Sequence, residues 1–138
     1  MNTPTTTLRL RPPLRAKIER IAKRTRRSVS AVTQDLLEEA LRTRECPGIN
    51  FADEPAGRVA KIAGTGLGVW EVIRDYLTCG KNIRLVKKGL PDLSDADVQT
   101  ALFYYARYPR EIDEAIAENE TLYHERMQLQ TSGAPRRP

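Results

Sequence analysis

The sequence predicts a mainly α-helical chain built from two small modules, and three observations predict it. An alternating stretch at residues 5–11 is followed at once by two prolines and then by two helical patterns. Residues 69–107 hold three more helical patterns, of which the middle one is short. One long amphipathic pattern then covers residues 109–130. The expected organisation is a first module at 1–45, a connector at 46–57, a helix-turn-helix or winged-helix-like module with its C-terminal helix at 58–130, and a disordered tail at 131–138.

Length and composition limit the class of protein. A chain of 138 residues suits one ordinary domain or two very small ones. No apolar run approaches the roughly 18–20 residues of a membrane span, and the start "MNTPTTT" lacks the features of a signal peptide. Cys46 and Cys79 are too few for a disulfide framework and match no zinc spacing. We therefore expect a cytoplasmic protein with reduced thiols and no membrane association.

The net charge of +5 is unevenly distributed. Residues 1–45 contain 11 Lys and Arg against 5 Asp and Glu, whereas residues 46–138 contain 12 against 13. Within 9–27 there are nine basic residues and only Glu19 is acidic. A segment this basic attracts a polyanion, and a phosphate backbone is the usual one. A merely solvated basic face is the alternative.

The alternating N-terminal stretch predicts a β-strand without a partner in its own chain. Alternation places Leu8 and Leu10 on one face and Thr7, Arg9 and Arg11 on the other. A hairpin would need a turn and a second alternating run nearby, and the sequence has neither. The strand is therefore expected to pair with a second copy of the protein.

Two short helices follow this strand. Proline is well placed in the first turn of the first helix, at Pro13, and Ser28 and Ser30 are both candidate N-caps of the second. One strand and two short helices bury too little apolar surface to be stable alone. We expect the dimer core to consist of Leu8, Leu10, Ile18, Ile21, Val32, Leu36 and Leu37.

Residues 5–43, which include "LRLRPPLRAKIERIAKRT", resemble the ribbon-helix-helix domain of bacterial repressors and antitoxins. The resemblance implies an intertwined homodimer whose two-stranded ribbon enters the major groove of operator DNA. The outward residues of the ribbon, which would contact bases, are Thr7, Arg9 and Arg11. The implied phosphate contacts are Lys23, Arg26, Arg27, Ser28 and Ser30. The family often has Gly where this chain has Arg26, so we expect a left-handed residue there at a cost of about 1 kcal/mol.

The second module is expected to begin with a short strand at 58–63. Gly64, Gly66 and Gly68 would then shape a tight turn before a helix that begins near Val69 and ends at Gly80. Their spacing is not G-x-G-x-x-G, and no Gly-Lys-Ser/Thr follows, so a nucleotide-binding loop is rejected.

Two further helices are expected next. In the short stretch "NIRLVKKG" we expect Ile83, Leu85 and Val86 to be buried and Arg84, Lys87 and Lys88 to point outward. The following helix has Ser94 as N-cap and Asp97 at the third position, a variant of the capping box, and it ends before Pro109.

The segments "AGTGLGVWEV" and "LPDLSDADVQTALFYY", within residues 47–113, resemble the family catalogued as domain of unknown function 433. The resemblance implies a small helix-turn-helix-like domain of antitoxin-type proteins, with a recognition helix at about 94–107. That helix starts among Asp92, Asp95 and Asp97, which repel phosphate. We therefore favour packing or partner binding over DNA contact for this module.

No catalytic constellation is present in the sequence, so we expect neither an enzyme nor a bound cofactor or metal. The only histidine, His124, lies in an acidic helix without a recognisable nucleophile motif, and we expect it at the surface. That final helix carries apolar residues near one side, which suits either a solvated helix or one that fills a partner's groove. These apolar residues are Ile112, Ala115, Ile116, Leu122, Tyr123 and Met127.

A ribbon-helix-helix head joined to this second domain is similar to antitoxins of Vap type, whose toxins are PIN-domain ribonucleases. The resemblance implies an autorepressor associated with the nucleoid that also neutralises a toxin. The implied toxin contacts are Ile112, Ile116, Tyr123, Arg126 and Met127, and an arginine that could block the toxin's acidic metal site is Arg110, Arg126, Arg136 or Arg137. The alternative is a stand-alone transcription regulator whose second domain oligomerises or senses a signal. A plain protein–protein adaptor is disfavoured by the Arg/Thr face of the strand.

Overall fold

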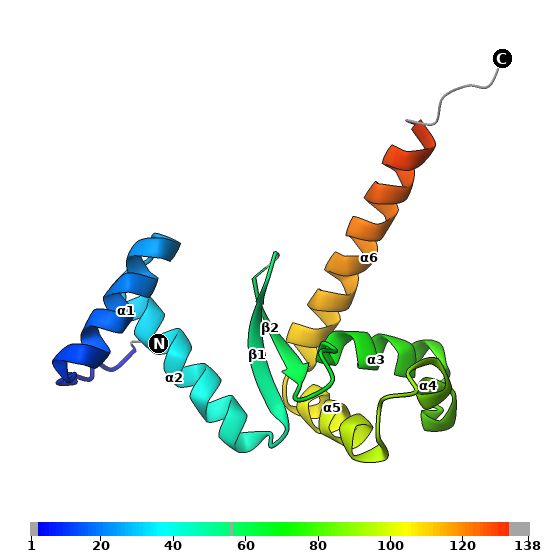
Figure 1. Ribbon diagram of the computed structural model, residues 1–138, viewed down its shortest axis with the longest axis horizontal. Coiled ribbons are helices and arrows are strands. Elements are labelled where there is room, and N and C mark those ends of the chain that lie inside the picture. Colours follow the sequence, from blue (N-terminus) through cyan, green and yellow to red (C-terminus); the bar gives the residue numbers. More distant parts are fainter. Residues whose placement is uncertain (1–2, 56, 133–138) are drawn as a thin grey trace. The chain divides into compact units, whose positions relative to one another are not determined.

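A computed structural model describes residues 3–55 and 57–132 and shows a mainly helical chain (Figure 1). In this part of the chain there are six helices and one two-stranded antiparallel sheet. The elements are α1 (Pro12–Thr25), α2 (Val29–Glu45), β1 (Ile49–Glu54), β2 (Gly57–Ile62), α3 (Val69–Thr78), α4 (Ile83–Gly89), α5 (Asp95–Arg107) and α6 (Pro109–Ser132). The chain divides into two compact units between Arg42 and Thr43. The expected mainly α-helical class is confirmed. The disordered tail was expected to begin at residue 131, which is wrong for Thr131 and Ser132 because α6 continues through them, and residues 133–138 lie outside the described residues.

The first unit is built from α1 and most of α2. Pro12 and Pro13 occupy the first two positions of α1, where a fixed φ suits the helix and no intrahelical N–H bond is needed. The helix ends in a Schellman motif at Arg26, whose φ of 55° and ψ of 44° are left-handed. In this motif the amide of Arg27 donates to the Ala22 carbonyl at 2.9 Å. The expectation of a left-handed Arg26 is confirmed.

Helix α2 begins directly after Ser28. The Ser28 hydroxyl oxygen accepts a hydrogen bond of 3.0 Å from the amide of Ala31, which is the geometry of an N-cap. Ser30 lies inside the first turn instead. Of the two candidate caps, Ser28 is the one that the helix uses.

The segment before α1, residues 3–11, contains no strand in the single chain. A strand is defined by ladder hydrogen bonds to a neighbour, and no described part of this chain supplies that neighbour. Leu10 is half-buried and packs on the core of the first unit, whereas Leu8 is 58% exposed. That core contains three buried residues, Ile18, Ala22 and Val32.

The second unit opens with a β-hairpin. β1 and β2 are antiparallel, with Ile49 opposite Ile62 and Phe51 opposite Ala60. β2 confirms the expected strand at 58–63 to within one residue. The expectation that 46–57 is only a connector is wrong, because β1 lies there and both Cys46 and Ile49 are buried in the core.

Three helices follow the hairpin in the expected order, with the short α4 in the middle. The turn before α3 contains Gly64 and Gly66 at φ values of 80° and 70°, as a tight glycine turn requires. Asn82 caps α4 by accepting from the Leu85 amide at 3.3 Å. The capping box predicted for α5 is confirmed, since Ser94 accepts from the Asp97 amide and its own amide donates to the Asp97 carboxylate.

The main core lies in this second unit, where α3 and α5 contribute the residues with no exposed surface. These residues are Val69, Val72, Ile73, Val98, Ala101 and Tyr104. Leu85 is 47% exposed, so its expected burial is wrong. A helix of seven residues turns only one narrow face inward, and Val86 occupies that face.

Helix α6 has an inner and an outer half. Near its start, Ile112 is buried and Ile116 is half-buried against the core of the second unit. From residue 121 to residue 131 every side chain is exposed. Within the second unit, α6 therefore extends beyond the helices on which it packs (Figure 1).

Candidate nucleic-acid interface

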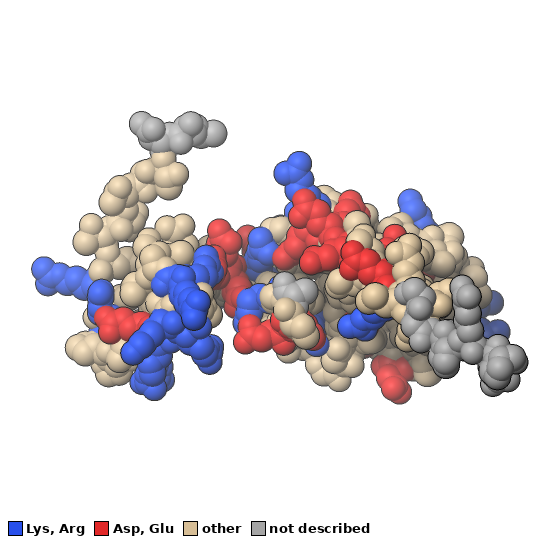
Figure 2. Space-filling view, turned by 90° about the horizontal axis from the view of Figure 1, so that it is seen from above, with Lys and Arg blue, Asp and Glu red and all other residues tan. Residues whose placement is uncertain are grey.

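Lysine and arginine side chains gather on the first unit (Figure 2). The nine basic residues between 9 and 27 are all exposed. Arg15 pairs with Glu19 at 2.8 Å along the surface of α1, which reduces its availability only slightly because both side chains are more than half exposed. The unit therefore presents a cationic surface suited to phosphate groups.

The predicted base contacts Thr7, Arg9 and Arg11 are exposed side chains that precede α1. Arg11 has the extended conformation, with φ of −60° and ψ of 140°. In a single chain these three residues are not part of a ribbon. A ribbon at these residues would require a second chain.

The predicted phosphate contacts meet at the turn between α1 and α2. All five of these residues are exposed, namely Lys23, Arg26, Arg27, Ser28 and Ser30. The amide of Arg27 is already bonded to Ala22, and the Ser28 hydroxyl is bonded to Ala31. Among the described residues, the amides of Val29 and Ser30 at the helix start have no such acceptor, so they are the donors that an anion would meet.

Arg27 differs from its basic neighbours because its guanidinium is paired. Its Nη1 donates to Oδ2 of Asp35, which lies further along α2. No ion pair is present for Lys23 or Arg26 in the described part of the chain. The sequence did not indicate this pair, since a separation of eight residues is not a standard helical spacing.

The residues expected in the dimer core fall into two groups. Ile18 and Val32 are buried within one chain, and Leu10 and Ile21 are half-buried. Leu8, Leu36 and Leu37 are exposed by 58%, 39% and 50%. Leu14 and Leu41 are exposed as well. The apolar residues of the first unit thus exceed what its own core can cover.

The predicted toxin contacts on α6 are only partly at the surface. Ile112 is 3% exposed and serves the core, so its assignment to a partner surface is wrong. Ile116 is half-buried. Tyr123, Arg126 and Met127 are exposed, with Tyr123 at 61%. Leu129 also belongs to this exposed surface, and its spacing of seven residues from Leu122 is a signal that could have identified it.

A groove that the sequence did not indicate runs beside the outer half of α6. It is lined by the half-buried Trp70, by Val59 of β2 and by Leu122 of α6. Charged side chains also line this groove, among them Lys61 and Arg126. The groove thus combines an aromatic surface with a charged rim, which is typical of protein contact sites.

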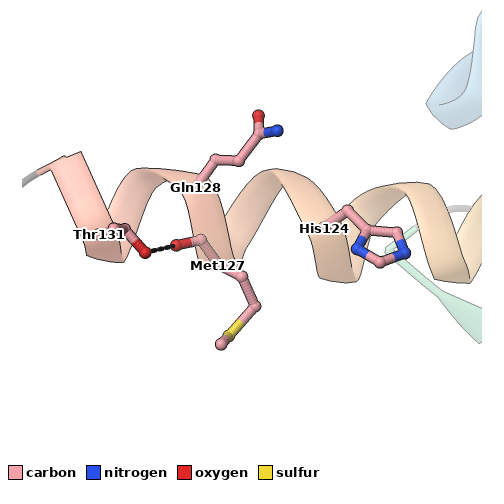
Figure 3. A pocket seen from close by; sticks show the side chains of 4 residues that line it. All are labelled: His124, Met127, Gln128 and Thr131. Carbon is pink, nitrogen blue, oxygen red and sulfur yellow. Dashed lines mark hydrogen bonds between the residues drawn. The ribbon is translucent and has the colours of Figure 1, made fainter.

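His124 lies on the outer half of α6, exposed as expected. Figure 3 shows it with Met127, Gln128 and Thr131 along a shallow hollow of one helix, where the Thr131 hydroxyl donates to the Met127 carbonyl at 2.8 Å. The residues that the structure describes include no cluster of His, Cys, Asp and Glu suited to a metal ion. None of the helices described is both long and apolar enough to cross a membrane.

Comparisons with models of protein families, with curated proteins and with solved structures found no match to this chain. Of the arginines considered for a toxin's metal site, Arg110 and Arg126 are exposed on α6. Arg136 and Arg137 lie outside the described residues.

Proposed function

We propose that the chain is a dimeric DNA-binding antitoxin that represses its own operon and neutralises a PIN-type ribonuclease. The observation that carries the proposal is the combination, in the first unit, of a basic surface with an incomplete apolar core. Three residues are buried there, while five leucines of the same unit are exposed. Small units of this kind require a partner to bury enough apolar surface.

A second copy would cover the exposed leucines of the first unit and pair with its N-terminal stretch. Two-fold pairing covers the exposed leucines of α2, namely Leu36, Leu37 and Leu41, with the same residues of the other copy. It also supplies an antiparallel neighbour for residues 5–11. The paired strands would form a ribbon that presents Thr7, Arg9 and Arg11 from both copies to the major groove.

The turn between α1 and α2 would anchor this ribbon on the DNA backbone. The amides of Val29 and Ser30 and the positive end of α2 favour a phosphate oxygen. Lys23 and Arg26 add exposed positive charge beside them. Such contacts position the protein without selecting a sequence.

The outer half of α6 is the surface proposed for the toxin. Leu122, Tyr123, Met127 and Leu129 are exposed apolar residues on a helix that extends past its own core. Within residues 121–131 this outer half holds one acidic residue, Glu125, and one basic residue, Arg126, so a partner with an apolar groove suits it. Arg126 is the exposed arginine on this outer half.

A stand-alone transcription regulator is the second candidate. This candidate is favoured because Ile112 and Ile116 pack in the core of the second unit. These two expected toxin contacts are therefore not on the surface that a toxin would meet. In that case the second unit would serve oligomerisation or sensing, and the first unit would act on DNA as described above.

The decisive experiment captures the full-length chain from its native lysate and footprints it on its own promoter. Promoter protection together with a co-purifying small ribonuclease is the expected result. Protection without that ribonuclease would favour the stand-alone regulator. Absence of protection at low salt would overturn the DNA-binding proposal itself.

A further inference from the structure

We propose that Asp35 competes with DNA phosphate for Arg27 and thereby limits the DNA affinity of the first unit. This inference rests on the proposed DNA-binding function. The observation behind it is the direct ion pair between Arg27 Nη1 and Asp35 Oδ2. Asp35 thus lowers the DNA affinity although it is not one of the predicted DNA contacts.

The pair directs Arg27 away from the start of α2. Asp35 lies about 9 Å of helix rise beyond Val29, at 1.5 Å per residue. A guanidinium bound there lies along the side of the helix instead of in front of its first amides. The phosphate expected at Val29 and Ser30 would therefore meet Arg27 only after the ion pair has opened.

The backbone of Arg27 offers no substitute donor. Its amide is used in the Schellman motif, where it donates to Ala22 at 2.9 Å. With its amide and its Nη1 both engaged, Arg27 contributes less to an anion site than its position suggests. An arginine keeps several other N–H donors, so the pair weakens the contact without abolishing it.

The pair is weak enough to be exchanged. The Arg27 and Asp35 side chains are 46% and 50% exposed, and a surface pair of this kind contributes little, so a DNA phosphate can replace the carboxylate as the partner of the guanidinium. Removal of the competitor should therefore tighten DNA binding by a factor of about 2–5 per protomer, as the usual strength of exposed ion pairs implies.

The test compares Asp35→Asn with Glu38→Gln by titration of a labelled promoter duplex. Glu38 is an exposed acid of the same helix that has no ion pair in the described part of the chain, so its variant removes one negative charge without releasing Arg27. Both substitutions are repeated in an Arg27→Ala background. Thermal unfolding of each variant confirms that it is folded.

The expected result is a clear affinity gain for Asp35→Asn, a smaller gain for Glu38→Gln, and equal small gains in the Arg27→Ala background. Equal gains in the natural background would overturn the inference, as would a gain of Asp35→Asn that persists without Arg27. In both cases the proposed function would stand, because the unmodified chain binds the duplex. If no variant binds DNA, the proposed function fails and this inference fails with it.

Discussion

The hydroxyl group of Tyr104 donates a hydrogen bond of 2.5 Å to Oε2 of Glu111, across the corner between α5 and α6. Tyr104 has no exposed surface, and its ring centre lies 4.9 Å from that of Tyr108. Glu111 is in the first turn of α6, where the positive end of the helix favours a carboxylate. The bond therefore helps to fix the direction in which α6 leaves the core.

Tyr104→Phe should lower the free energy of unfolding by roughly 1.5–3 kcal/mol, because it removes a hydrogen bond to a charged acceptor at a buried site. Urea unfolding measures this loss. Tyr105→Phe is the matched control, since the bond from Tyr105 to Asp113 lies at the surface, and its cost should stay near 0.5 kcal/mol. Equal losses in the two variants would contradict the structural role of Tyr104.

Tyr105 should lose its proton at a higher pH than an ordinary tyrosine. The hydrogen bond to Asp113 raises the pKa of Tyr105 above 10.0, and desolvation and the charge of Asp113 act in the same direction. A pKa raised in the folded state adds stability below pH 10, and that stability is lost as the pH rises through the folded value. NMR titration of the tyrosine rings should show the pKa of Tyr105 falling in Asp113→Asn, and an unchanged value would contradict the assignment.

Arg26→Gly should have opposite effects on stability and on DNA binding. Glycine adopts the left-handed conformation without the steric cost of an L-residue, so the variant should be more stable by up to about 1 kcal/mol. It also removes a positive charge from the proposed phosphate site, so promoter affinity should fall. Urea unfolding and duplex titration measure the two effects. A variant that is both more stable and equally tight on DNA would argue against a phosphate contact at this turn.

Leu37→Glu should dissociate the proposed dimer. Leu37 is 50% exposed in one chain, and a charge placed there would be buried between two copies. Sedimentation should show a monomer at concentrations where the unmodified chain is a dimer. Leu85→Glu is the control, because Leu85 is 47% exposed in the second unit. If both variants remain dimeric, the first unit is not the dimer interface.

Arg9→Ala should cost about 1–3 kcal/mol of specific DNA binding and leave the dimer intact. Lys23→Ala is the matched comparison, because removing a phosphate-binding charge should weaken binding to all sequences and reduce the salt dependence. Titrations of promoter and unrelated duplexes at several salt concentrations separate the two. An unchanged affinity in Arg9→Ala, or dissociation of the dimer, would refute the assignment of the strand faces.

Local signals in the sequence were sufficient for most helix boundaries. The paired prolines marked the start of α1, and the Ser94–Asp97 box marked that of α5. Ser28 and Ser30 together marked the start of α2, and the structure shows that Ser28 is the cap. Each of these signals acts through hydrogen bonds or backbone angles within a few residues, so the local sequence determines where the helix begins.

Features that depend on distant contacts were missed. β1 is rich in acidic residues and flanked by Pro and Gly, and its strand character comes from pairing with β2 and from burial of Ile49. The burial of Ile112 likewise depends on the core of the second unit. The Arg27–Asp35 pair was also missed, because its formation depends on the backbone path of the turn before α2. For the strand at 5–11 and the site that it would form, a partner chain is the missing information.

The division of α6 into a packed inner half and an exposed outer half affects how the protein can be degraded. Arg126 is in the exposed half, beyond Ile112 and Ile116, which hold the helix to the core. A protease that cuts after Arg126 would remove Met127 and Leu129 without first unfolding the second unit. The clipped product would keep its first unit intact, so a single cleavage would abolish the proposed partner binding and leave the proposed repression in place.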